Sequence, residues 1–172
     1  MSWDGDEVDT KVEGKGRPEK SPHRLAVTRP SWDEYFLNIA EAVSARSHDA
    51  ETKVGCVIVD VEHRVLATGY NGYPPGYSDE LLPNIRPYKY KYMVHAEMNA
   101  IASSRADLRG GTLYCTSTPC NDCAKAIVTA GIKRVVCAKA YSMHDGVAAE
   151  ALDLLRMGGV EAVVGLPVES VG

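Results

Sequence analysis

The strongest constraint on this chain is a set of metal-binding side chains split between two distant segments. Residues 95–97 (His-Ala-Glu) offer an imidazole and a carboxylate, and residues 119–123 (Pro-Cys-Asn-Asp-Cys) offer two thiols spaced for one cation. Together they supply three ligands for a zinc ion and one general acid/base, and they leave a fourth coordination position open for water. The fold therefore has to bring these two segments together.

The spacing within each segment predicts where the site lies. Cys120 and Cys123 share one face if they open a helix, and Pro119 suits that start because its missing N–H would have lacked a partner. The positive end of the helix dipole favours both thiolates. His95 and Glu97 are two residues apart, so they converge only where a helix begins. We therefore predict a site over two helix N-termini, with one zinc ion bound by His95, Cys120 and Cys123.

Charge counting suggests a role for Glu97. Zinc with two thiolates and a neutral imidazole is formally neutral, so it acidifies water less than a three-histidine zinc does. A nearby carboxylate that takes the proton is then needed, and Glu97 is the candidate. The activated water would attack an amidine-like carbon, ammonia would leave, and a carbonyl would replace the amino group.

Three other interpretations compete. A structural zinc would ordinarily have four protein ligands, yet the remaining cysteines fall in apolar, strand-like runs and are expected in the core (Cys56, Cys115 and Cys137). A redox Cys-x-x-Cys pair would give no role to the His-x-Glu segment. In the third interpretation the pattern is a coincidence and His95 is a core histidine.

Composition limits the class of protein. The chain has 172 residues, enough for one domain with a proper core, and is 45% hydrophobic and 24% charged, as expected of a soluble globular protein. No apolar run approaches membrane-spanning length, and the polar N-terminus does not read as a secretory signal. Five cysteines, an odd number, favour a reducing cytoplasm. A net charge of −4 gives no electrostatic reason to expect a nucleic-acid partner.

The pattern along the chain predicts a flexible tail over residues 1–28, a domain over 29–166 and a short C-terminal tail over 167–172. Ser31 and Glu34 form a candidate capping box at the first helix. The expected order is helix, strand, strand, helix, strand, helix, strand, helix and strand. This order implies an α/β fold, a three-layer α/β/α domain with one mixed five-stranded sheet.

Several segments together resemble the deoxycytidylate (dCMP) deaminase family of the cytidine deaminase superfamily. The similar segments are SWDEYFLNIAEAVSARS, VGCVIVD, GYNGYPPG, HAEMNAI, GTLYCTSTPCNDCAKAIVTAGIKRVV and LLRMGGV, spread over residues 30–164. The zinc signature alone would indicate only the superfamily. The SWDEYF and GYNG-x-Pro-x-Gly segments narrow the resemblance to the nucleotide-specific branch. The resemblance implies a cytidine deaminase-like fold and zinc-dependent hydrolysis of dCMP to dUMP and ammonia, which would supply dUMP for thymidylate synthesis.

The resemblance also implies further site residues. Asn71 matches an asparagine that contacts the substrate sugar, although an Asn-Gly pair after a strand also suits a simple turn. Arg46 matches a residue that helps to bind the 5′-phosphate, although an arginine at a helix end also complements the dipole. Ala96 is expected to contact the substrate. Tyr141 lies near a position where an aromatic ring closes over the pyrimidine, and a surface tyrosine is the alternative.

Partners follow from the same resemblance. Members of the family are activated by dCTP, inhibited by dTTP and commonly form hexamers, so a homo-oligomer with these effectors is expected here. Some members bind a second zinc through extra Cys and His residues near the long segment 71–94, and no such set is apparent in this chain. The alternatives are a deaminase of RNA bases, such as a tRNA adenosine deaminase, and a catalytically silent zinc domain.

The stretch 89–92 (Lys-Tyr-Lys-Tyr) within the segment 71–94 also permits two interpretations. Basic and aromatic residues in alternation suit contact with single-stranded nucleic acid. In an acidic chain they are better explained as the edge of a loop or a subunit contact. A loop as long as 71–94 inside a compact domain is usually functional.

Overall fold

The computed structural model describes residues 25, 27–140 and 146–166. The helices are α1 (Trp32–Ser44), α2 (Ala96–Ser103), α3 (Asn121–Thr129) and α4 (Val147–Met157), with a 3-10 helix η1 (Tyr88–Lys91). The strands are β1 (Gly55–Val59), β2 (Val65–Tyr70), β3 (Thr112–Ser117), β4 (Arg134–Lys139) and β5 (Glu161–Val164). The predicted order of helices and strands is therefore confirmed.

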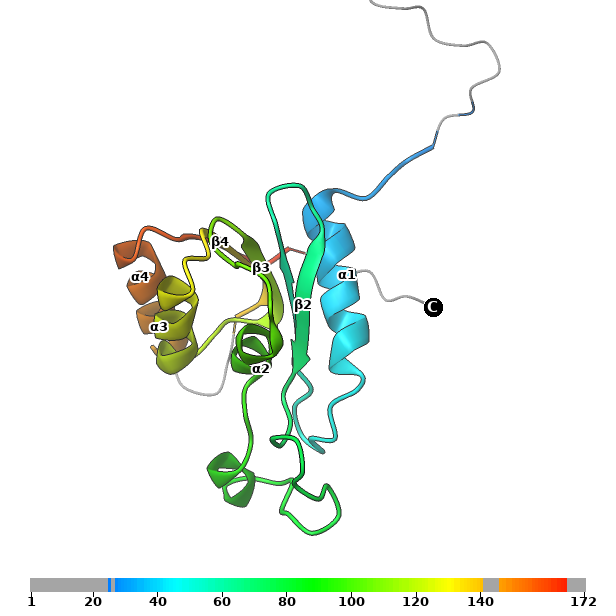
Figure 1. Cartoon of the computed structure of the whole chain (residues 1–172), viewed down its shortest axis with the longest axis vertical. Coiled ribbons are helices and arrows are strands. Elements are labelled where there is room, and N and C mark those ends of the chain that lie inside the picture. The colour runs from blue at the N-terminus through cyan, green and yellow to red at the C-terminus, as the bar shows by residue number, and fades with distance from the viewer. Residues whose placement is uncertain (1–24, 26, 141–145, 167–172) are drawn as a thin grey trace, which may run out of the picture.

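The five strands form one mixed sheet in the order β2-β1-β3-β4-β5. Strand β1 is antiparallel to both β2 and β3, whereas β3, β4 and β5 run parallel. Helix α1 covers one face, and α2, α3 and α4 cover the other (Figure 1). This is the predicted three-layer arrangement. No helix in the described ranges is both long and apolar enough to cross a membrane.

Three cysteines form a row through the centre of the sheet. Cys56 of β1 is in register with Cys115 of β3, which is in register with Cys137 of β4, and all three are fully buried. They lie in the core on the side of α2, α3 and α4. Their expected place in the core is confirmed, and they line the sheet beneath the helices that carry the metal-binding signature.

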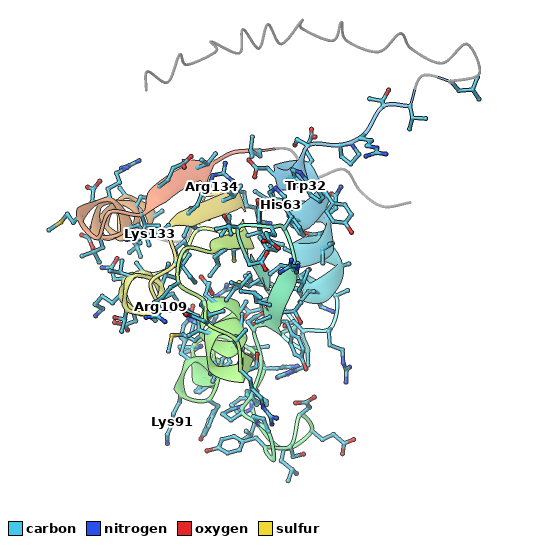
Figure 2. The ribbon with its side chains drawn as sticks, turned by 45° about the horizontal axis from the view of Figure 1, so that its top comes forward. Trp32, His63, Lys91, Arg109, Lys133 and Arg134 are labelled. Carbon is cyan, nitrogen blue, oxygen red and sulfur yellow. The ribbon has the colours of Figure 1, made fainter. Side chains whose placement is uncertain are left out.

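Helix α1 begins at the predicted capping box. The Ser31 hydroxyl accepts a hydrogen bond from the Glu34 backbone N–H at 3.2 Å, and the Glu34 carboxylate accepts one from the Ser31 N–H at 2.7 Å. In the first turn, Trp32 stacks on His63 of the β1–β2 turn, with ring centroids 4.3 Å apart (Figure 2). The buried face of the helix includes Phe36, Leu37 and Ala40.

A half-buried ion pair anchors α1 to the sheet. Arg134 of β4 donates two hydrogen bonds to Asp33, at 2.6 and 2.8 Å, in the bidentate geometry that gives such pairs their strength. The hydroxyl of Tyr114 on β3 donates a third at 2.9 Å. These hydrogen bonds lower the pKa of Asp33, with that from Arg134 contributing most.

The segment 71–94 is fixed at both ends. Gly72 and Val94 form an antiparallel bridge, with N–H to carbonyl distances of 3.1 and 2.8 Å. The segment leaves the end of β2 and returns at the start of α2, and it carries η1 near its return (Figure 1). The predicted tails over 1–28 and 167–172 lie almost entirely outside the described residues, so the domain limits stay a prediction.

Two glycines let helices touch the sheet on opposite faces. A Cβ on Gly69 of β2 would lie 2.3 Å from the carbonyl oxygen of Ala96 and 2.4 Å from the backbone nitrogen of Ala100, both in α2. A Cβ on Gly55 of β1 would lie 1.9 Å from the carbonyl oxygen of Ala40 in α1. Only a residue without a side chain permits such close approach of backbones.

Gly69→Ala should therefore destabilise the protein and displace α2. We expect the free energy of unfolding to fall by about 2 kcal/mol or more, because the added methyl group meets backbone atoms that cannot move independently. Urea unfolding measures the loss, and Gly72→Ala is the control because the nearest atoms to its Cβ would belong to the side chains of Tyr70, at 3.2 Å, and His48, at 3.6 Å. Equal stability of the two variants would contradict this account of the contact.

Asp33→Asn tests the anchor of α1. The pKa of Asp33 is lowered in the folded protein, so its contribution to stability is present above the pKa of the unfolded chain and is lost as the pH falls through the folded value. We expect the variant to be less stable by about 1 kcal/mol at pH 7 and the difference to shrink in acid. Urea unfolding over a pH series measures this. A difference that stays constant down to pH 2 would contradict the ion-pair interpretation.

Candidate active site

The first half of the site lies at the start of α2. His95 occupies the N-cap position with an extended backbone (φ −70°, ψ 154°), and its carbonyl accepts the first helical hydrogen bond from Asn99 at 2.9 Å. Glu97 follows within the first turn and is 4% exposed. Because His95 stands outside the helical spiral, the imidazole and the carboxylate can serve the same site although they are two residues apart.

The second half lies at the start of α3. Cys120 is the N-cap residue, also extended (φ −82°, ψ 174°), and Cys123 lies within the first turn with 1% of its surface exposed. Pro119 is fully buried immediately before the cap. The two cysteines therefore flank one helix N-terminus, and the predicted placement of these four residues at the starts of two helices is confirmed.

The three predicted ligands meet at one point. The Nδ1 atom of His95 lies 3.4 Å from Sγ of Cys120 and 3.5 Å from Sγ of Cys123. Tetrahedral zinc with ordinary bond lengths requires a nitrogen–sulfur separation of about 3.6 Å. All ligand atoms of the group lie within 4.8 Å of one another. The donor set therefore fits a zinc ion with three protein ligands.

The electrostatic surroundings of the two cysteines favour binding of a cation. A hydrogen bond from the Cys123 thiol, helped by the neighbouring His95, lowers the pKa of Cys120 to about 3. The same hydrogen bond and burial raise the pKa of Cys123. One thiolate and one thiol thus share a proton, which a metal ion would displace, since zinc binds the thiolate form.

Glu97 is buried beside the ligands. Burial raises the pKa of its carboxyl group above the usual value. A carboxyl group whose pKa is raised toward neutrality exchanges protons more readily in both directions, which suits a general acid/base.

A pocket of about 320 Å³ opens in front of these residues. One part of its lining surrounds the ligands and Glu97, and it includes His95, Ala96, Glu97, Ser117, Thr118 and Cys120. A second part, here called the polar wall, consists of Asp49, Thr52, Asn71, Arg86, Lys89 and Tyr90. The pocket thus joins the predicted metal site to a surface rich in charge.

Asn71 lies in the polar wall, and both its side-chain nitrogen and its side-chain oxygen form hydrogen bonds within the protein. Its Nδ2 group donates to the carbonyl of Thr52 at 2.8 Å and to Asp49 at 3.1 Å, and its Oδ1 atom accepts from the Val54 N–H at 2.7 Å. Its backbone carbonyl accepts from the Ser47 hydroxyl at 2.7 Å. Asn71 therefore does more than form a turn, because it ties the start of β1 to the end of β2.

The other predicted substrate residues have different surroundings. Ala96 is fully buried and lines the pocket between His95 and Glu97. Arg46 is exposed just beyond α1 and is not among the residues that line the pocket. Tyr141 lies outside the described residues. The roles of Arg46 and Tyr141 stay predictions.

Lys89 was missed by sequence reasoning, which placed it at a loop edge or a subunit contact. It is 2% exposed, and its ammonium group lies 2.7 Å from both carboxylate oxygens of Asp49 and 3.1 Å from Glu51. Arg86 reaches the same Glu51 carboxylate at 3.4 Å. Burial acts to raise the pKa of Asp49, but hydrogen bonds from Lys89 and the backbone hold that pKa below its usual value. No local sequence pattern links residue 49 to residue 89.

Comparison with known proteins identifies the family. Residues 30–139 match the family model of the cytidine and deoxycytidylate deaminase zinc-binding region. The chain belongs to this deaminase family. The group of His95, Cys120 and Cys123 is the candidate for its zinc ion within the described ranges.

Individual deaminases are similar over most of the described chain. Human deoxycytidylate deaminase is 42% identical over 137 residues, which cover 75% of this chain and 76% of the human one. Mouse deoxycytidylate deaminase is 45% identical over 112 residues, covering 61% and 63%. A crystal structure of dCMP deaminase from the cyanophage S-TIM5, in complex with dCMP and dUMP, superposes with a TM-score of 0.64 at 31% identity and covers 80% of this chain and 99% of that one.

The site should bind one zinc ion per chain. We expect Cys123→Ala to lose the metal, because two ligands seldom hold structural or catalytic zinc. The matched control is Cys137→Ala, which removes a buried core thiol outside the ligand group and should keep one zinc. Plasma mass spectrometry of the purified proteins gives the stoichiometry. Full zinc occupancy in Cys123→Ala would exclude this ligand set.

Proposed function

We propose that this protein is a zinc-dependent deaminase that hydrolyses dCMP to dUMP and ammonia. The observation that carries the proposal is the convergence of His95, Cys120 and Cys123 beside a buried Glu97 in one pocket. The relatives named as deoxycytidylate deaminases, and the S-TIM5 structure with dCMP and dUMP, support the choice of nucleotide. The dUMP produced would be available for thymidylate synthesis.

In the proposed reaction Glu97 moves the protons. Bound zinc would supply Lewis-acid activation of a water molecule. Glu97 takes a proton from that water and passes it to the ring nitrogen beside the reacting carbon, and it then carries the second proton to the departing amine. The water oxygen becomes the carbonyl oxygen of uracil, and the amino group leaves as ammonia. The raised pKa of Glu97 favours such a carrier.

The pocket and its surroundings offer groups for the rest of the nucleotide. Ala96 lines the pocket beside the reacting centre, and Oδ1 of Asn71 keeps a second lone pair that can accept a hydrogen bond from a sugar hydroxyl. We assign Arg46, next to Ser47, to the 5′-phosphate, and Tyr141 to the face of the pyrimidine. Both assignments rest on the family resemblance.

Two alternative functions have less support. A deaminase of RNA bases would need a basic surface for the phosphate backbone, whereas this chain carries a net charge of −4. A catalytically silent zinc domain would have no chemical need for a buried carboxylate beside the ligands. We further propose that the protein acts in the cytoplasm, because all five cysteines are free, and that it assembles as a homo-oligomer, with dCTP and dTTP as effectors.

The test is turnover by the zinc-loaded protein with dCMP, deoxycytidine and dCTP supplied separately, followed by loss of cytosine absorbance and release of ammonia. We expect turnover of dCMP, and we expect Glu97→Ala to lower kcat by about 10³-fold or more, because proton transfer then lacks its carrier. Each assay is repeated with dCTP or dTTP added, to detect regulation. Absence of turnover with every cytosine compound would refute the proposed function.

Arg46→Ala forms a second arm of the same assay. If Arg46 binds the 5′-phosphate, KM for dCMP rises by about tenfold while the kinetics with deoxycytidine stay unchanged. Arg105→Ala is the matched control, since Arg105 is also an exposed arginine just beyond a helix end. Unchanged KM for dCMP in Arg46→Ala would remove this residue from the phosphate site.

A further inference from the structure

Lys89 is a buried cation in the polar wall of the pocket. Its Nζ atom lies 2.7 Å from each oxygen of Asp49, whose side chain is 2% exposed, and 3.1 Å from Glu51. Lys91, two residues on in the same short helix, is exposed and points away from the body of the protein (Figure 2). The burial of Lys89 is therefore specific to this position and not general to the segment.

Asp49 connects Lys89 to the residues that shape the pocket. One of its oxygens accepts backbone hydrogen bonds from Glu51 and Thr52, each at 2.9 Å, and the other accepts from Nδ2 of Asn71 at 3.1 Å. The pair thus joins the connection between α1 and β1, the end of β2 and the helix η1.

The formal charges of the polar wall, taken together with the adjoining Glu51, sum to zero. Asp49 and Glu51 bring two negative charges, and Lys89 and Arg86 bring two positive ones, all within the distances of direct ion pairs. A buried ion pair adds little stability compared with well-packed apolar residues, because desolvation offsets the attraction. Stability alone therefore does not explain why this cation lies in the wall of a substrate pocket.

A nucleotide brings its own negative charge into this pocket. Its base must reach Glu97 and the metal ligands, so the 5′-phosphate at the opposite end of the molecule faces the remaining polar lining. A carboxylate left without its cation in such a partly desolvated wall would repel the phosphate strongly.

We propose that Lys89 is a positioning and specificity residue, which neutralises Asp49 so that the polar wall accepts a phosphate-bearing substrate and holds Asn71 in place. This inference rests on the proposed function, since it concerns the nucleotide of that same site. It assigns Lys89 no contact with the reacting atoms. The electrostatic role predicts effects on the phosphate that a purely structural role would not produce.

The experiment measures calorimetric binding of dUMP and of deoxyuridine, which lacks the phosphate, to the zinc-loaded protein. The readout is the ratio of the two dissociation constants, because a general loss of packing weakens both ligands alike. We expect Lys89→Met to reduce the preference for dUMP by about tenfold or more, since one negative charge is then uncompensated. Lys91→Met is the matched control and should leave the preference unchanged.

Two further variants keep the test decisive if Lys89→Met does not fold. Asp49→Asn removes the anion and should increase the preference for dUMP, and Asp49→Asn combined with Lys89→Met restores the charge balance and should return the preference to within about threefold of the wild-type value. Opposite shifts in the two single variants, or recovery in the double variant, support the inference. A preference that is the same in wild type, Asp49→Asn and the double variant while Lys89→Met is unfolded, or the same in all folded variants, overturns it.

The binding measurement also separates this inference from the proposed function. A wild-type protein that does not turn over dCMP refutes the function. A wild-type protein that turns over dCMP, with variants that retain the wild-type preference for dUMP, refutes only the role of Lys89. Zinc content measured on each variant excludes loss of the metal as the cause of weaker binding.

Discussion

The site depends on direct contact between the backbones of α2 and β2. Gly69 lies so close to Ala96 and Ala100 that no side chain fits between them, and this contact fixes the height of the helix above the sheet. The side chain of Asn99 adds a hydrogen bond to the carbonyl of Tyr70 at 2.8 Å. His95 and Glu97 extend from the end of this clamped helix, so their positions are set by the main chain and need little further support. Groups positioned by the main chain in this way suit catalysis, which requires preorganised groups.

Much of this arrangement could be predicted from the sequence, because the signals are local. A capping box, an apolar strand-like run or a Pro-Cys-x-x-Cys segment each constrains a few neighbouring residues, and each was found where its pattern indicated. The two halves of the metal site could also be paired without coordinates, since neither half is a complete ligand set. The helix starts followed from the same reasoning, because His95 and Glu97 have no other way to face one point.

The polar wall could not be predicted, because it is assembled from residues far apart in the chain. Lys89 belongs to a basic and aromatic stretch that suits a loop edge, nothing in the sequence singles out Asp49, and the two partners are forty residues apart. A lysine is rarely buried unless a carboxylate pairs with it, so the sequence alone predicts an exposed side chain at this position. The ion pair between Asp49 and Lys89 also depends on the path of the long segment between β2 and α2. Tertiary contacts such as the Gly72–Val94 bridge set this path, and no local pattern predicts them.

The two parts of the pocket therefore follow different physical rules. Around His95, Cys120 and Cys123, thiolate and imidazole groups create a centre suited to a cation, and the local sequence is sufficient to specify it. In the polar wall and the adjoining Glu51, paired charges from the connection between α1 and β1 and from the segment 71–94 cancel, so the surface is polar without favouring either sign. In the role that we propose for Lys89, a single charge in this wall sets the preference for an anionic substrate without changing the metal ligands. Changes of substrate within the same fold would then arise in the segments that carry Asp49 and Lys89, while the zinc signature stays the same.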